Sequence, residues 1–193
     1  MTHRSSGGGY RSAVPHSRSE DRAQAARELS YYEPRGFDSF CMAFQIFSNA
    51  FADGGWIPDL NTCQGADVSP SLEWSGEPPE TRSFTLVLDD PDAPVGTWVH
   101  WLLYDIAPQA HNLAQGFKAG SMGMSGRNSW GKTGYGGPCP PKGHGPHRYF
   151  FHLYALDVST LGLPAGAGRE ELEGVMKGHV LAEAQCMARF ERK

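Results

Sequence analysis

Short stretches of apolar residues separated by turns dominate the hydrophobic pattern of the chain. Residues 83–88, Ser-Phe-Thr-Leu-Val-Leu, are mostly apolar, while residues 98–106 and 149–157 alternate along much of their length. Alternation with a period of two predicts β-strands. Residues 40–47 are apolar on both faces, which is typical of a further, buried strand.

Side chains that share a parity in a strand share a face of the sheet. In residues 98–106 this rule places one set of side chains together: Trp98, His100, Leu102, Tyr104 and Ile106. For the predicted strand 149–157, the set that shares one face begins at His147, two residues before the strand: His147, Tyr149, Phe151, Leu153 and Ala155. Each set is expected to point towards one side of its sheet.

Only the C-terminal part of the chain has helical spacing. Residues 169–171 supply first-turn acids, and apolar positions at helical spacing continue to Phe190. Gly174 and Gly178 interrupt them, so we expect two short helices that meet near Gly178. Strands come first, helices come last and no βαβ alternation appears. The chain is therefore predicted to be mainly β, an antiparallel sandwich-like fold with two short C-terminal helices.

Residues 1–36 contain little that could pack. They include three consecutive glycines, many serines and scattered charges, with one short stretch, 20–29, of helical composition. We expect a flexible N-terminal tail followed by one domain over residues 37–193.

Composition and charge narrow the classes of protein. The 24 Gly and 14 Pro among 193 residues argue against a helical bundle, because both residues break helices. The net charge is −4; six Arg and four acidic residues give the tail +2, which leaves −6 on the rest of the chain. That balance argues against a basic nucleic-acid-binding surface, so no nucleic-acid partner is expected.

Cysteine spacing and hydropathy bear on the compartment. The four cysteines, at 41, 63, 139 and 186, resemble neither a disulfide framework nor a structural zinc site. No apolar run approaches the roughly 18 residues of a membrane span, and the N-terminus has no apolar core of a secretory signal. We therefore expect a soluble cytoplasmic protein without a transmembrane segment. Whether Cys63 and Cys139 approach each other stays open.

One motif match is rejected on its context. Residues 126–133, Gly-Arg-Asn-Ser-Trp-Gly-Lys-Thr, fit the P-loop pattern. That chemistry needs a buried strand before the loop and a helix after it. Here residues 119–123 do not resemble a strand, and the Gly- and Pro-rich residues 134–141 cannot form a helix. An NTPase is not expected.

Three carboxylates lie within four residues at Asp89, Asp90 and Asp92. They are compatible with a turn, with a site for a hard metal ion, or with a carboxylate that orients a histidine. The candidate partners are His100, His144 and His147. His100 on its own reads as a core histidine, and the H-x-x-H spacing of the other two is weak evidence for a metal. We expect no metal and no cofactor.

Several segments, taken in order, resemble one known family. They are 67–74, Asp90-Pro-Asp-Ala-Pro94, Trp98-Val-His-Trp101, Gly137-Pro-Cys-Pro-Pro-Lys-Gly143, His147-Arg-Tyr149 and 178–182. Together they resemble the phosphatidylethanolamine-binding protein family, in its bacterial Raf-kinase-inhibitor-like branch. The resemblance runs from about Phe44 to Phe190 and does not cover residues 1–36.

The resemblance implies a large central sheet, a smaller sheet and a small pocket that binds an anion such as phosphate or a phospholipid head group. Its side chains would be Asp90, Trp98, His100, Pro141, His147 and Tyr149, with backbone amides near Gly137, Pro138 and Cys139. A phosphorylated protein partner is a further possibility. The C-terminal segment, 169–192, lacks the tyrosine that closes the pocket in eukaryotic members. The pocket is therefore expected either to be more open or to be covered by residues 111–133.

Two functions remain after this reading. The first is a non-enzymatic binding protein without catalytic residues. The alternative is a small hydrolase or transferase that uses Asp90, His100 and His147 as acid–base groups. The sequence offers no nucleophile paired with a base, which favours binding.

Overall fold

The structure is a computed structural model that describes residues 1–2, 43–120 and 122–193. Residues 3–36 of the predicted tail therefore lie outside the described residues, as do the first three residues of the predicted strand 40–47. Within the described residues no helix is both long and apolar enough to span a membrane.

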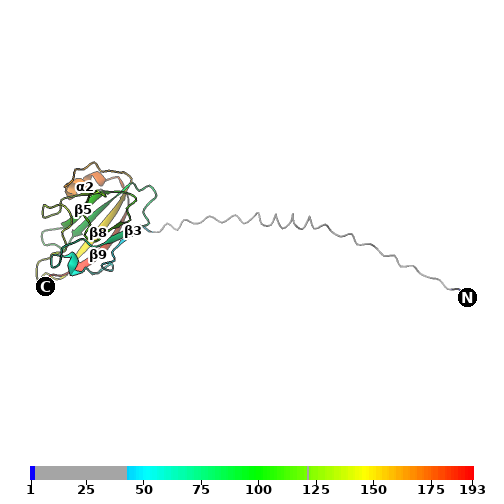
Figure 1. Ribbon diagram of the computed structural model, residues 1–193, viewed down its shortest axis with the longest axis horizontal. Helices are drawn as coiled ribbons and strands as arrows, with labels where there is room; N and C mark the ends of the chain where they lie inside the picture. The colour runs from blue at the N-terminus through cyan, green and yellow to red at the C-terminus, as the bar shows by residue number, and fades with distance from the viewer. Residues whose placement is uncertain (3–42, 121) are drawn as a thin grey trace. The chain divides into compact units, whose positions relative to one another are not determined.

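Two sheets make up the domain (Figure 1). The larger has the order β2-β9-β8-β4-β5-β7, from Gly55–Trp56, Val180–Phe190, His147–Leu156, Ser83–Asp90, Trp98–Ile106 and Met124–Ser125. The smaller has the order β1-β3-β6, from Gln45–Phe47, Leu72–Ser75 and Asn112–Leu113. A short 3-10 helix, η2 (Asp59–Asn61), and an α-helix, α2 (Arg169–Met176), complete the elements. All strand pairs are antiparallel except β2 with β9, so the predicted fold class is confirmed.

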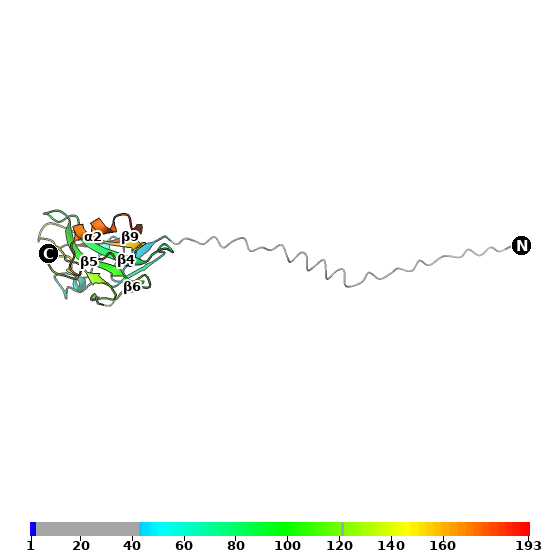
Figure 2. The same cartoon turned by 90° about the horizontal axis from the view of Figure 1, so that it is seen from above.

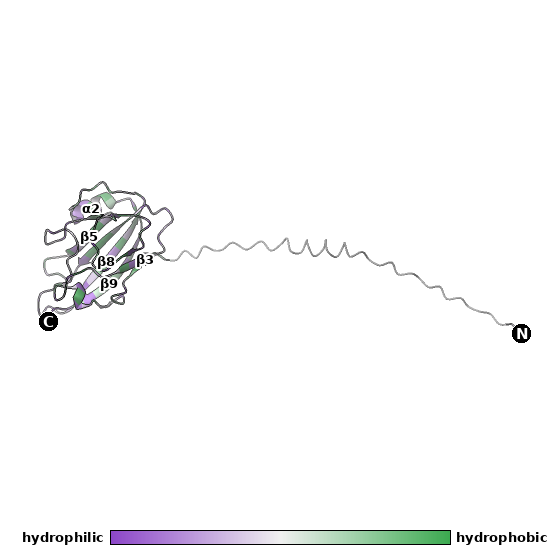
Figure 3. Ribbon diagram, viewed as in Figure 1, coloured by the Kyte–Doolittle hydropathy of each residue, from purple (hydrophilic) through white to green (hydrophobic). Residues whose placement is uncertain are grey.

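The core has two parts because the central strands of the larger sheet are buried on both faces. One cluster lies on the side of the smaller sheet and includes Trp74, Phe84 and Phe151. The other packs Val87 and Leu102 against α2. Figure 2 shows α2 and β6 on opposite sides of β4 and β5. In Figure 3 the hydrophobic residues concentrate on the central strands, while α2 carries both hydrophobic and polar residues. Every residue of β4 is buried, including the polar residues Ser83, Thr85, Asp89 and Asp90.

One of the two predicted C-terminal helices is wrong. The first is α2, but the segment after Gly178 is β9, the longest strand of the domain. Its buried residues alternate with a period of two: Ala184, Cys186, Ala188 and Phe190. Three of these four are small and contribute little hydrophobicity, so the alternation was less visible than the helical spacing that overlaps it.

Two β-bulges in β5 also correct the predicted faces. The register with β4 shifts where His100 is inserted and again near Asp105, whose φ is 54°. Each extra residue reverses the parity of the residues that follow. Leu102 and Tyr104 therefore face α2, whereas Trp101, Leu103 and Ile106 face the smaller sheet. The strand 40–47 was also predicted to be buried on both faces; of β1, only Ile46 is buried.

Candidate functional site

A small cavity lies where β4, β5 and β8 meet the loops that connect them. Its volume is about 170 Å³. We call it the Asp90 cavity. It is lined by Asp90, Ala93, Pro94, Val95, Trp98, His100, Trp130, Cys139, Pro140, Pro141 and His147.

The centre of the cavity wall is a buried carboxylate–imidazole pair. The Asp90 Oδ2 atom and the His147 Nδ1 atom are 2.8 Å apart, and both residues are 3% exposed. The other Asp90 oxygen accepts the backbone N–H of Asp92 at 2.8 Å, which closes the turn after β4. Because a carboxylate only accepts, His147 donates from Nδ1, and its Nε2 atom is the nitrogen left for other contacts.

His100 is held in a different way. Its Nδ1 atom donates to the carbonyl of Gly136 at 2.7 Å, and its ring packs edge-on against Tyr149 with 5.2 Å between ring centroids. Burial lowers the pKa of His100, so the ring is neutral at neutral pH. That ring contact places His100 on the same side of the sheet as Tyr149.

The three clustered carboxylates have three separate partners. Asp89 faces the opposite side of β4 and contacts Arg169 and His152. Although burial opposes the shift, hydrogen bonds from these two residues lower the pKa of Asp89. Asp92 accepts two side-chain hydrogen bonds and one backbone hydrogen bond from Arg148, and the side-chain bonds lower its pKa. The carboxylates therefore do not converge, and no cluster of three or more potential metal-ligating side chains occurs among the described residues.

Tyr149 lies behind the cavity wall. It is fully buried, and its hydroxyl has no hydrogen-bond partner among the described residues. Burial, with the negative charge of Asp90 beside it, raises the pKa of Tyr149. The indole N–H of Trp98 is a second buried donor without a partner. Buried polar groups are usually satisfied, so two unpaired donors beside one cavity are unusual.

The predicted backbone donors are only partly in place. The N–H of Gly137 already donates to Asp67 Oδ1 at 2.7 Å, and Pro138 has no N–H. Neither residue lines the Asp90 cavity. Of the three, only Cys139 reaches it.

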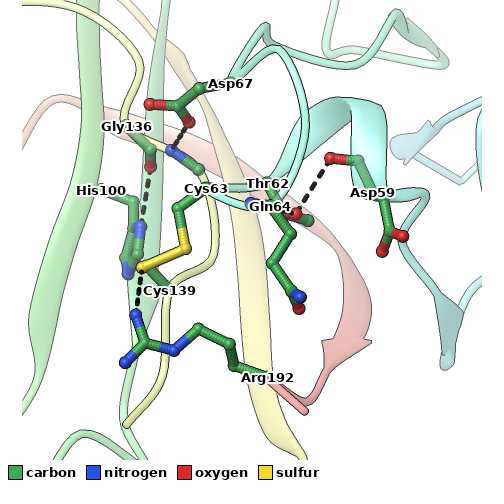
Figure 4. Close-up of a disulfide and its surroundings, with 10 residues drawn as sticks. Asp59, Thr62, Cys63, Gln64, Asp67, His100, Gly136, Cys139 and Arg192 are labelled. Carbon is green, nitrogen blue, oxygen red and sulfur yellow. Dashed lines mark hydrogen bonds between the residues drawn. A yellow bond between two sulfur atoms is a disulfide. The ribbon is translucent and has the colours of Figure 1, made fainter. Parts of the chain in front are cut away.

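Cys139 forms a disulfide with Cys63, across 76 residues of sequence (Figure 4). The bond joins the segment after η2 to the loop that carries Pro140 and Pro141. The guanidinium of Arg192 donates to the Cys139 sulfur at 3.2 Å. The sequence showed no disulfide framework and left open whether these two cysteines meet; the structure joins them. Cysteine usage no longer supports a reducing compartment.

The predicted site lacked five lining residues, Ala93, Pro94, Val95, Trp130 and Pro140, of which Trp130 is the largest. Its ring packs edge-on against both Trp98 and His100, with centroid distances of 5.4 and 4.9 Å, yet the residue is 42% exposed. The buried side chain of Asn128 accepts the backbone N–H groups of Trp130 and Lys132 and so shapes this turn. The turn lies within the rejected P-loop match, and residues 134–141 contain no helix. An isolated tryptophan in a glycine-rich loop was the available signal.

Comparison with known proteins gives matches over most of the domain. A family model described as phosphatidylethanolamine-binding protein matches residues 47–191. A UPF0098 protein of Aquifex aeolicus is 47% identical over 151 residues, which cover 77% of this chain and 88% of the relative.

Two solved structures are also similar. The putative phosphatidylethanolamine-binding protein homolog CT736 of Chlamydia trachomatis has a TM-score of 0.73 and 40% identity, and covers 78% of this chain and 99% of its own. YbcL of Escherichia coli, described as a new member of the mammalian PEBP family, has a TM-score of 0.73 and 32% identity, with the same coverages.

Proposed function

Because the chain belongs to the phosphatidylethanolamine-binding protein family, we propose that it binds phosphate, or the phosphoryl group of a larger ligand, in the Asp90 cavity and catalyses no reaction on it. The larger ligand would be a phospholipid head group or a phosphorylated partner protein. The observation that carries the proposal is the buried Asp90–His147 pair in the cavity wall.

The chemistry of the wall suits a phosphoryl group. No Lys or Arg is among the lining residues, so an anion would be bound by the imidazolium form of His147. Its Nε2–H would form a charge-assisted hydrogen bond, and Asp90 would balance the cation. Neutral His100 donates its Nδ1–H to the Gly136 carbonyl. Its Nε2 lone pair can therefore accept a hydrogen bond from the P–OH group of a monoprotonated phosphate.

The same lining residues favour binding over hydrolysis. The sulfur of Cys139 is in a disulfide, so it is not a free nucleophile. Burial and the adjacent Asp90 raise the pKa of Tyr149, which keeps its hydroxyl protonated. Among the lining residues within the described ranges there is no serine, threonine or lysine.

Calorimetric titration with inorganic phosphate and with phosphoethanolamine tests the proposal. We expect binding by the native chain and at least about tenfold weaker binding by His147→Ala, because one hydrogen bond to a charged group contributes about 1.5–3 kcal/mol. His111→Ala is the matched control, since His111 pairs with Glu77 and does not line the cavity.

Two results would contradict the proposal. The first is no heat of binding with either ligand at millimolar concentration. The second is turnover of a phosphoester or ester that the Asp90→Asn variant loses while it stays folded, because that would indicate the hydrolase or transferase instead.

A further inference from the structure

The Asp90 cavity is the first of three neighbouring cavities. A second cavity, of about 250 Å³, shares Trp130 and Cys139 with it. A third, of about 350 Å³, shares Asp67, Thr133 and Tyr135 with the second. The first two are smaller than the roughly 300–1,000 Å³ of sites for drug-sized ligands, and the third is at the lower end of that range. Together they have room for an elongated ligand.

Of the five residues that the cavities share, Trp130, Asp67 and Thr133 are exposed, whereas Cys139 and Tyr135 are partly buried. We call the three adjoining cavities the groove. The groove beyond Trp130 carries polar groups, among them Lys132, Thr133 and Ser125. Val68, Trp101 and Phe117 add apolar surface to the same groove. A mixed lining suits a peptide, whose main chain needs hydrogen-bond partners while its side chains need pockets.

Asp67 is the fixed charge of this groove. Its Oδ1 atom accepts the backbone N–H of Gly137 at 2.7 Å, which leaves its second oxygen for another partner (Figure 4). Lys118 and Lys132 also line the groove, but both are exposed and form no ion pair among the described residues. The Asp67 carboxylate, fixed by its hydrogen bond, can therefore select a cationic side chain of a ligand. The two exposed lysine side chains can move aside when such a cation binds.

Net charge points to the same kind of partner. Residues 37–193 carry −6, which repels an anionic membrane surface and favours a basic segment around the phosphoryl group.

We infer that the groove binds an extended peptide with a phosphorylated residue in the Asp90 cavity and an Arg or Lys side chain on Asp67. This inference rests on the proposed function, because it needs a phosphoryl group in the Asp90 cavity. What it adds is the class of ligand and a residue that selects it.

Fluorescence anisotropy of the full chain with labelled phosphoserine peptides tests the inference. In a set of alanine-rich peptides, one arginine is placed at successive positions on either side of the phosphoserine. At low ionic strength we expect arginine at one or two positions to tighten binding about two- to fivefold, the range of an exposed ion pair.

The Asp67→Asn variant should abolish that gain while it keeps its affinity for inorganic phosphate. Asparagine can still accept the Gly137 N–H and tolerates the φ of 55° at this position, so the loop is preserved. Asp59→Asn is the matched control, because it removes one exposed negative charge from a residue outside the groove.

The inference is overturned if no position of arginine tightens binding, or if the Asp59→Asn variant loses as much of the gain in affinity as the Asp67→Asn variant. It is also overturned if vesicles that contain phosphatidylethanolamine bind more tightly than every peptide and Asp67→Asn does not change that binding. Failure of the proposed function looks different: neither phosphate nor any phosphopeptide would bind, and His147→Ala would change nothing.

Discussion

At the scale of single residues, neighbouring carboxylates differ because the strand sends them to different faces. Asp89 meets Arg169 and His152 on one side of β4, while Asp90 meets His147 on the other. The sequence showed the cluster and the candidate histidines but could not assign pairs, since the partners lie 57 to 80 residues away. Pairing depends on strand register, which only the folded sheet supplies.

The pair of His152 with Asp89 predicts a dependence of stability on pH. The hydrogen bond to Asp89, helped by Glu183 and opposed by burial, raises the pKa of His152. A histidine whose pKa is higher in the folded protein binds its proton more tightly there, and this stabilises the fold. The stabilisation is complete at pH values below the unfolded-state pKa of about 6.5 and is lost as the pH rises through the folded-state pKa. His152→Gln should therefore lower the free energy of unfolding more at about pH 6 than at about pH 9.

Urea unfolding of both proteins across this range measures the difference. His100 does not confuse the comparison, because it is present in both proteins and its pKa is lowered by burial. A cost of His152→Gln that is the same at every pH would contradict the assignment.

At the scale of elements, one loop determines much of the site. The glycine- and proline-rich residues 120–146 supply Trp130, Cys139, Pro140 and Pro141 to the Asp90 cavity. This could be predicted in outline, since the loop ends at His147, but its path could not. Gly137 shows why: a Cβ there would lie 2.5 Å from the Asn61 carbonyl oxygen, a contact made with a distant segment.

Gly137→Ala should therefore destabilise the protein by about 1–3 kcal/mol, the usual cost of overpacking, and should weaken phosphate binding because Cys139 and Pro140 would move. Gly174→Ala is the control: it lies in α2 with nothing within 4 Å of an added Cβ, so it should be neutral or stabilise by up to about 1 kcal/mol. Chemical denaturation of both variants decides this. Equal stability of Gly137→Ala and the native chain would mean that the loop does not need this close approach.

The mistaken elements have specific causes. The helical spacing predicted for residues after Gly178 competed with an alternation of small residues in β9, and burial against β8 decided between them. In β5 the alternation itself was present, but two bulges changed which face each residue takes. Bulges depend on pairing with β4, so a single stretch of sequence does not reveal them.

At the scale of the whole molecule, the disulfide joins segments that the sheets do not pair. Cys63 and Cys139 close a loop of 76 residues next to the Asp90 cavity. The sequence predicted the sandwich-like fold from its strands, and the family from ordered motifs, but it did not predict this bond.

A disulfide across a long loop stabilises mainly by restricting the unfolded chain. The double variant with Cys63→Ser and Cys139→Ser should lower the free energy of unfolding by about 2–4 kcal/mol. Guanidinium unfolding with and without a reducing agent measures this effect. The reductant should destabilise the native chain and leave the double variant unchanged, because Cys186, the remaining cysteine within residues 43–193, is already free. If the reductant has no effect on the native chain, the disulfide does not stabilise the fold.

The most direct test of the phosphoryl site follows the histidine rings themselves by NMR during a titration with inorganic phosphate. The ring signals of His147 and His100 should shift together and saturate, while those of His111 and His179, which pair with acids away from the cavity, should stay in place. If His147 does not shift at millimolar phosphate, or if all four rings shift alike, the Asp90 cavity is not a phosphoryl-binding site.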